Sequence, residues 1–76
     1  MPKKTMDSQP DNNIIGNNIK ALRLFYGLTQ QDVSLDLDWG MSTVSSYERG
    51  RTTPDIDHMK KLADYFFVPL SILSEF

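Results

Sequence analysis

The sequence predicts a single all-α domain, and three observations support this fold class. Apolar residues recur three and four positions apart, the spacing that places side chains on one face of a helix. Residues that cap or end helices punctuate these apolar stripes. No segment alternates polar and apolar residues with period two, so no sheet is expected. A chain of 76 residues has room for one domain with a modest core. We therefore expect a compact bundle of five short helices.

The first predicted helix follows a polar N-terminal stretch. Its apolar stripe consists of Ile15, Ile19, Leu22 and Tyr26. Asn12 or Asn13 is suited to cap its start, because a short polar side chain can accept a hydrogen bond from the first turn. Gly27 is expected to end it in the left-handed conformation. Residues 1–12 include two prolines and show no periodicity, which predicts a flexible N-terminal arm.

The second predicted helix covers residues 29–37. Thr29 is a good N-cap for it. Asp32 stands three residues later, where its carboxylate can complete a capping box. Val33 and Leu37 lie four positions apart and supply the buried face.

The third predicted helix covers residues 41–49 and follows after a turn of three residues. Neither short helix would be stable alone, and so tight a connection forces a steep crossing. Ser34 is small enough for the two helices to touch, and Asp38 tolerates the left-handed conformation that the turn requires. Gly40 is an acceptable N-cap and Gly50 ends the segment. The pair has the geometry of a helix-turn-helix.

Two further helices complete the predicted bundle. Asp55 can cap the fourth helix. Its apolar stripe consists of Ile56, Met59, Leu62, Ala63 and Phe66. The fifth helix starts after Val68-Pro69 and includes Leu73. The helical domain is thus predicted to cover residues 13–76.

Several short motifs carry a resemblance to a known family. They are Leu28-Thr29-Gln30 at the second helix, Glu48-Arg49-Gly50 at the end of the third, Pro54 soon after it, and Val68-Pro69-Leu70 before the fifth. With these motifs, residues 14–73 resemble the Cro/CI-type phage repressors and the wider XRE-like helix-turn-helix family. The resemblance implies a phage-repressor-like bundle of five helices, whose third helix enters the major groove of DNA.

The resemblance also implies roles for individual residues. The residues expected to read bases are Met41, Ser42 and Ser46. The residues expected to hold phosphates are Gln30, Thr43, Ser45, Arg49, Arg51 and Lys20. Arg23 and Glu48 are expected to form a structural, partly buried ion pair between the first and third helices. The chain departs from the family at Asp38, where the turn usually carries glycine.

Composition argues against several function classes. There is no cysteine, and His58 is the single histidine, so no metal site is expected. No set of nucleophile, base and orienting group can be assembled, so we expect neither an enzyme nor a cofactor. No apolar run reaches the ~20 residues of a membrane span, and we expect a cytoplasmic protein without a membrane partner. The net charge of −2 predicts weak non-specific binding to nucleic acid.

The predicted function is sequence-specific binding of double-stranded DNA by a transcriptional regulator, and we expect a repressor. A homodimer would place two recognition helices about 34 Å apart, matching a palindromic operator. The apolar residues that exceed the needs of a small core are candidates for its contact: Ile14, Phe25, Phe67, Ile72 and Phe76. Trp39 is expected to pack on the core. The alternatives are a helical protein-interaction module and the antitoxin of a toxin–antitoxin pair.

Overall fold

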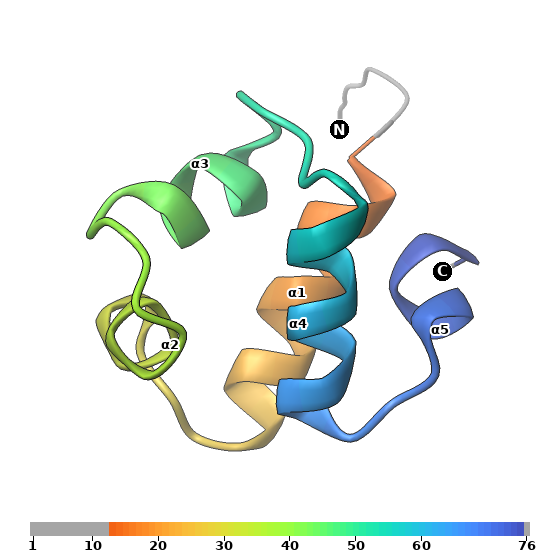
Figure 1. The fold of residues 1–76 in the computed structure, drawn as a ribbon, viewed down its shortest axis with the longest axis horizontal. Helices are drawn as coiled ribbons and strands as arrows, with labels where there is room; N and C mark the ends of the chain where they lie inside the picture. Colours follow the sequence, from red (N-terminus) through yellow and green to blue (C-terminus); the bar gives the residue numbers. More distant parts are fainter. Residues whose placement is uncertain (1–12, 76) are drawn as a thin grey trace, which may run out of the picture.

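The computed structural model describes residues 13–75, which form five helices and contain no strand. The helices are α1 (Ile14–Phe25), α2 (Gln30–Asp36), α3 (Thr43–Arg49), α4 (Ile56–Phe66) and α5 (Leu70–Glu75). The central helix is α1, which packs against α3, α4 and α5. In Figure 1, α2 and α3 lie on one side of α1 and α4, and α5 lies on the other. The all-helical prediction is confirmed. The predicted arm (1–12) and Phe76 lie outside the described residues.

Each helix contributes at least one buried apolar residue to the core. It consists of Ile19, Val33, Val44, Tyr47, Met59, Leu62, Ala63, Phe66 and Leu73. Trp39 is half-buried and packs against this cluster, as expected. Burial of a large apolar side chain contributes about 1.5–3 kcal/mol, so these few residues supply most of the stabilisation of so small a domain. None of the helices in residues 13–75 is long and apolar enough to cross a membrane.

The amino-terminal caps of α1 and α4 form as the sequence predicts. The choice between Asn12 and Asn13 falls on Asn13, whose side chain accepts a hydrogen bond from Gly16 N at 3.2 Å. Asp55 caps α4 by accepting from His58 N at 2.9 Å. Gly27 has a φ of 71°, so the chain leaves α1 through the left-handed region as expected.

The first helix of the motif, α2, also begins as predicted. The Thr29 hydroxyl accepts from Asp32 N at 3.0 Å, and the Asp32 carboxylate accepts from Thr29 N at 2.9 Å. This reciprocal pair is a complete capping box. Asp38 has a φ of 59°, the left-handed conformation predicted for the turn. Ser34 is fully buried, as a small residue packed between the two helices would be.

The predicted start of the third helix was wrong. We expected residues 41–49 with Gly40 as the cap, but α3 begins at Thr43 with Ser42 in the N-cap position. Gly40 has no side chain to accept a capping hydrogen bond. Its carbonyl instead accepts from Thr43 N at 3.1 Å, which forms a turn before the helix. Met41 therefore lies in this turn rather than in the helix.

Ile56 is a second correction. Its place in the apolar stripe of α4 predicts that it is buried, yet it is 58% exposed. Ile56 is the first residue of α4, so it lies at the end of the stripe, before the helix reaches the core. The other members of that stripe are buried. At the opposite end, Phe67 ends α4 in a left-handed conformation with a φ of 58°.

Candidate nucleic-acid interface

The three predicted base-reading residues lie at the amino-terminal end of α3. Met41 is 58% exposed and Ser42 is exposed, both just before the helix. Ser46 is half-buried. Its N–H donates to Ser42 O at 2.9 Å, so the two serines lie one helical turn apart on the same side. Val44 is buried on the core side of the same helix. The arrangement gives α3 one packed face and one polar face.

The predicted phosphate-binding residues are distributed over three segments. Thr43 and Ser45 are half-buried on α3, and Arg49 is exposed in its last turn. Gly50 follows with a φ of 77°, and Arg51 N returns to donate to Ser46 O at 3.0 Å. This reversal keeps the exposed Arg51 beside the end of α3. Gln30 begins α2, and Lys20 is exposed on α1.

Arg23 and Glu48 form the ion pair that was expected between α1 and α3. Arg23 Nε donates to Glu48 Oε2 at 2.7 Å, and a second guanidinium nitrogen donates to Glu48 Oε1 at 3.0 Å. The side chains are 10% and 4% exposed. Arg23 also donates to Leu28 O at 2.9 Å. The hydrogen bond from Arg23 to Glu48 raises the pKa of the guanidinium, although burial acts in the opposite direction.

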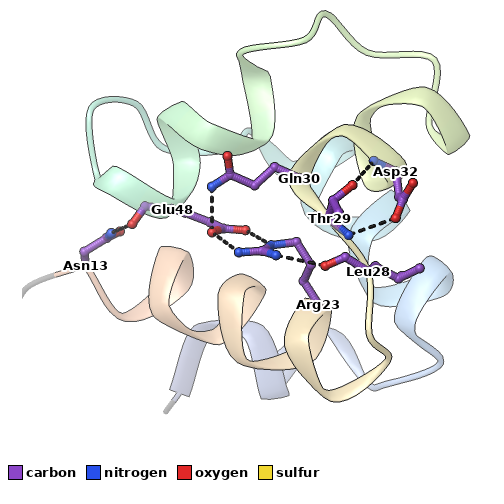
Figure 2. Close-up of polar contacts among 7 residues, drawn as sticks. All are labelled: Asn13, Arg23, Leu28, Thr29, Gln30, Asp32 and Glu48. Atoms are coloured by element: carbon purple, nitrogen blue, oxygen red, sulfur yellow. Dashed lines mark hydrogen bonds and ion pairs between the residues drawn. The ribbon is translucent and has the colours of Figure 1, made fainter.

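Glu48 binds a further partner that sequence reasoning missed. The side-chain amide of Gln30 donates to Glu48 Oε1 at 3.0 Å (Figure 2). The same carboxylate therefore connects the end of α1, the start of α2 and the end of α3. Gln30 is predicted to bind a phosphate. Its hydrogen bond to Glu48 fixes the position of its side chain at the start of α2.

Asn13 is a second residue that sequence reasoning undervalued. The sequence predicts it only as a cap for α1, but its Nδ2 also donates to Glu48 O at 2.8 Å. In Figure 2 the Asn13 side chain lies at the carboxyl end of α3, away from the Arg23 guanidinium. No local pattern signals this bond, because the two residues are 35 positions apart.

An aromatic cluster supports α3 from the other side. The ring of His58, on α4, stacks on Trp39 with centroids 4.1 Å apart. The Tyr47 hydroxyl lies 2.7 Å from His58 Nδ1. Burial, together with the nearby Asp55 charge, raises the pKa of Tyr47. His58 thus serves as a packing partner. Residues 13–75 contain no group of three or more metal-binding side chains.

Two acidic groups on α2 make structural contacts. Asp32 belongs to the capping box of α2. Asp36 accepts from the Tyr65 hydroxyl at 2.5 Å, which connects α2 to α4. Burial, and then this hydrogen bond, raise the pKa of Tyr65 to about 12. Two of the negatively charged side chains of the chain, Asp32 and Asp36, therefore stabilise α2.

Comparisons with known proteins agree with this geometry. The helix-turn-helix family matches residues 19–73. The cryptic phage CTXphi transcriptional repressor RstR of Vibrio cholerae is 30% identical over 60 residues, which cover 79% of this chain and 54% of the relative. The chain thus spans about half the length of that curated relative.

Two solved structures share the fold. The BldD DNA-binding domain of S. venezulae matches with a TM-score of 0.71 and 30% identity, over 80% of this chain and 91% of that one. A crystal structure of the DNA-binding domain of BldD matches with a TM-score of 0.72 and 29% identity, over 88% and 97%. Because the family match extends from the middle of α1 to α5 and includes the whole motif, the chain belongs to the helix-turn-helix family.

Proposed function

We propose that this protein is a sequence-specific, DNA-binding transcriptional regulator that places α3 in the major groove. The observation that carries the proposal is the two-sided character of α3. Its Val44 and Tyr47 side chains are buried in the core, whereas Ser42 and the preceding Met41 remain exposed. A short helix that is fixed on one side and polar on the other is suited to present its amino-terminal residues to base edges.

The proposed contacts fall into two classes. Met41, Ser42 and Ser46 would read bases, with serine able to donate or accept and methionine able to contact a thymine methyl group. Arg49 and Arg51 would bind phosphates. Thr43, Ser45, Gln30 and Lys20 are proposed to add further phosphate contacts. Phosphate contacts set the register of the protein on DNA without reading its sequence.

A homodimer on a palindromic operator is part of the proposal. Phe25 is 80% exposed and Phe67 is 89% exposed, which is unusual for large aromatic residues on a small domain. The aromatic ring of Tyr26, next to Phe25, stacks on Phe66, next to Phe67. The two exposed residues therefore belong to neighbouring ends of α1 and α4 and are the favoured dimer contact. The similarity to RstR, a phage repressor by name, supports repression rather than activation.

Selection from a random duplex library tests the proposed function. We expect the enriched sequences to be imperfect inverted repeats with half-sites about one helical turn apart. Ser46→Ala should change base preference at one half-site position by roughly 1–2 kcal/mol. Arg51→Ala should weaken binding to all sequences alike and lower the salt slope by about one unit. If nothing is enriched at low salt, DNA binding is wrong and a protein-interaction module takes its place.

A further inference from the structure

We propose that Asn13 is a positioning residue for base reading, because it fixes the carboxyl end of α3 to the start of α1. The inference rests on the proposed function of α3 and names a residue outside the motif on which that function depends. Asn13 carries out two tasks with one amide group. Its Oδ1 accepts from Gly16 N at 3.2 Å and so caps α1. Its Nδ2 donates to Glu48 O at 2.8 Å.

The surroundings of Asn13 are closely packed. A Cβ atom built on Gly16 would lie 2.1 Å from Tyr47 O, so the backbones of α1 and α3 touch at this point. A Cβ on Gly50 would lie 3.1 Å from Asn13 Cγ. The asparagine side chain therefore occupies the corner between the start of α1 and the end of α3, with little room to move.

The recognition helix needs such an external bond. α3 has seven residues, which is too short for a helix to be stable alone. The last four carbonyls of any helix lack partners within the helix. In α3, the N–H groups of Gly50 and Arg51 satisfy Tyr47 O and Ser46 O. Glu48 O receives its hydrogen bond from Asn13 instead.

The two ends of α3 are held very differently. At the amino end, Ser42 makes no side-chain capping bond. At the carboxyl end, Glu48 is held through its carbonyl by Asn13 and through its carboxylate by Arg23 and Gln30 (Figure 2). Ser42 and Glu48 are six positions apart, about 9 Å along a helix. A tilt at the held end is therefore carried to the reading end, where hydrogen bonds tolerate only a few tenths of an ångström.

Two substitutions separate the capping task from the positioning task. Asn13→Asp has the same shape and keeps a good N-cap acceptor, but it sets a carboxylate oxygen against Glu48 O. Asn13→Ser also keeps the cap, adds no charge and is too short to reach Glu48 O. Asn18 supplies the matched control, because its Nδ2 donates to Ile72 O at 3.1 Å and Leu73 O at 2.9 Å, in the same way but on α5. Asn18→Asp and Asn18→Ser make identical changes away from α3.

The experiment measures binding of each full-length variant to the enriched duplex and to a scrambled duplex of equal length. Salt is fixed, and the temperature is one at which circular dichroism shows every variant folded. We expect Asn13→Asp to lower the ratio of specific to non-specific affinity about tenfold, the effect of losing one base contact. Asn13→Ser should lower it severalfold, and both Asn18 variants should stay within about twofold of wild type.

Equal ratios in the Asn13 and Asn18 variants would overturn the role of Asn13 and leave DNA binding intact. A wild-type protein that prefers neither duplex would overturn the proposed function itself, and this inference with it. If Asn13→Asp does not fold, the comparison of Asn13→Ser with Asn18→Ser decides the question.

Discussion

The two helices of the motif have equal length but are stabilised in different ways. α2 and α3 each contain seven residues and are neighbours in the chain. α2 begins with a complete capping box formed by Thr29 and Asp32 within its own first turn. α3 begins at Ser42 without a side-chain capping bond and depends on contacts with α1 and α2 through Glu48.

The difference indicates that the two helices of the motif have different roles. The capping box of Thr29 and Asp32 specifies where α2 starts. We therefore regard α2 as the platform, the element whose start is set by local contacts and against which α3 packs. Contacts over 18 to 35 positions of sequence set the position of α3. The amino end of α3 is thereby left with its polar groups available for a ligand.

Removal of the Glu48 carboxylate should have the largest effect on stability. Glu48→Ala leaves Arg23 buried without its charged partner and should destabilise the domain by about 3–5 kcal/mol. Small domains have about 5 kcal/mol or somewhat more in total, so this variant is expected to be largely unfolded. Denaturant midpoints measure the loss.

The double variant Arg23→Met, Glu48→Leu is the control for this prediction. It removes both charges and should recover much of the stability, because no unpaired charge remains buried. If the losses from changing Arg23 and Glu48 singly simply add up to the loss in the double variant, the two side chains are not coupled.

The next largest loss of stability is expected when the backbone contact between α1 and α3 is disrupted. Gly16→Ala places a Cβ 2.1 Å from Tyr47 O, and the two helices must move apart. We expect a loss of about 3 kcal/mol, at the upper end of the range for overpacking. Gly40→Ala is the matched change, because its Cβ would meet Thr43 Oγ1 at 3.6 Å, an ordinary contact. Urea unfolding of both variants measures the two losses of stability. Equal unfolding midpoints for Gly16→Ala and Gly40→Ala would contradict the close contact of α1 with α3.

The next largest effect on stability is expected at the amino-terminal cap of α2, compared with that of α3. Thr29→Ala removes a capping bond and should destabilise the domain by about 1 kcal/mol. Ser42→Ala removes no such bond and should change stability by less than about 0.5 kcal/mol. Thr29→Ser keeps a hydroxyl and serves as the control. Thermal unfolding followed by circular dichroism separates the two cases, and similar losses at Thr29 and Ser42 would remove the distinction between α2 and α3.

The smallest expected effect is at the end of α4. Phe67 adopts a left-handed conformation while 89% exposed, whereas Gly50 ends α3 in the same region. Phe67→Gly relieves a backbone strain of about 1–2 kcal/mol but gives the unfolded chain more freedom. The net result should be a gain of about 0.5 kcal/mol in the unfolding free energy, measured in dilute solution. A loss of stability would show that Phe67 makes contacts within the monomer.

Sequence reasoning succeeded where the deciding contacts are local. The cap at Thr29, the cap at Asp55 and the left-handed turn at Asp38 are each specified by residues within three or four positions. The bonds from Asn13 to Glu48 and from Asn18 to Ile72 cross 35 and 54 positions, and no spacing rule announces them. The Arg23–Glu48 pair was foreseen through family resemblance rather than from a pattern of charges.

The start of α3 shows why the same reasoning failed at the site itself. A glycine, a methionine and a serine in succession carry weak preferences, so the sequence predicts a cap at Gly40 only because glycine is tolerated there. The structure places a turn between Gly40 and Thr43 instead. The outward position of Ser42 survives this shift, since Ser46 N still donates to its carbonyl.

The central claim is that the outer face of α3 contacts DNA while α2 serves as its platform. Nuclear magnetic resonance of the labelled chain, titrated with a duplex that carries the selected site, tests it residue by residue. We predict the largest changes in backbone amide shifts at residues 41–51 and at Gln30, with small changes at residues 33–36 of α2. Largest changes in α4 or α5, with residues 41–51 unaffected, would contradict the account.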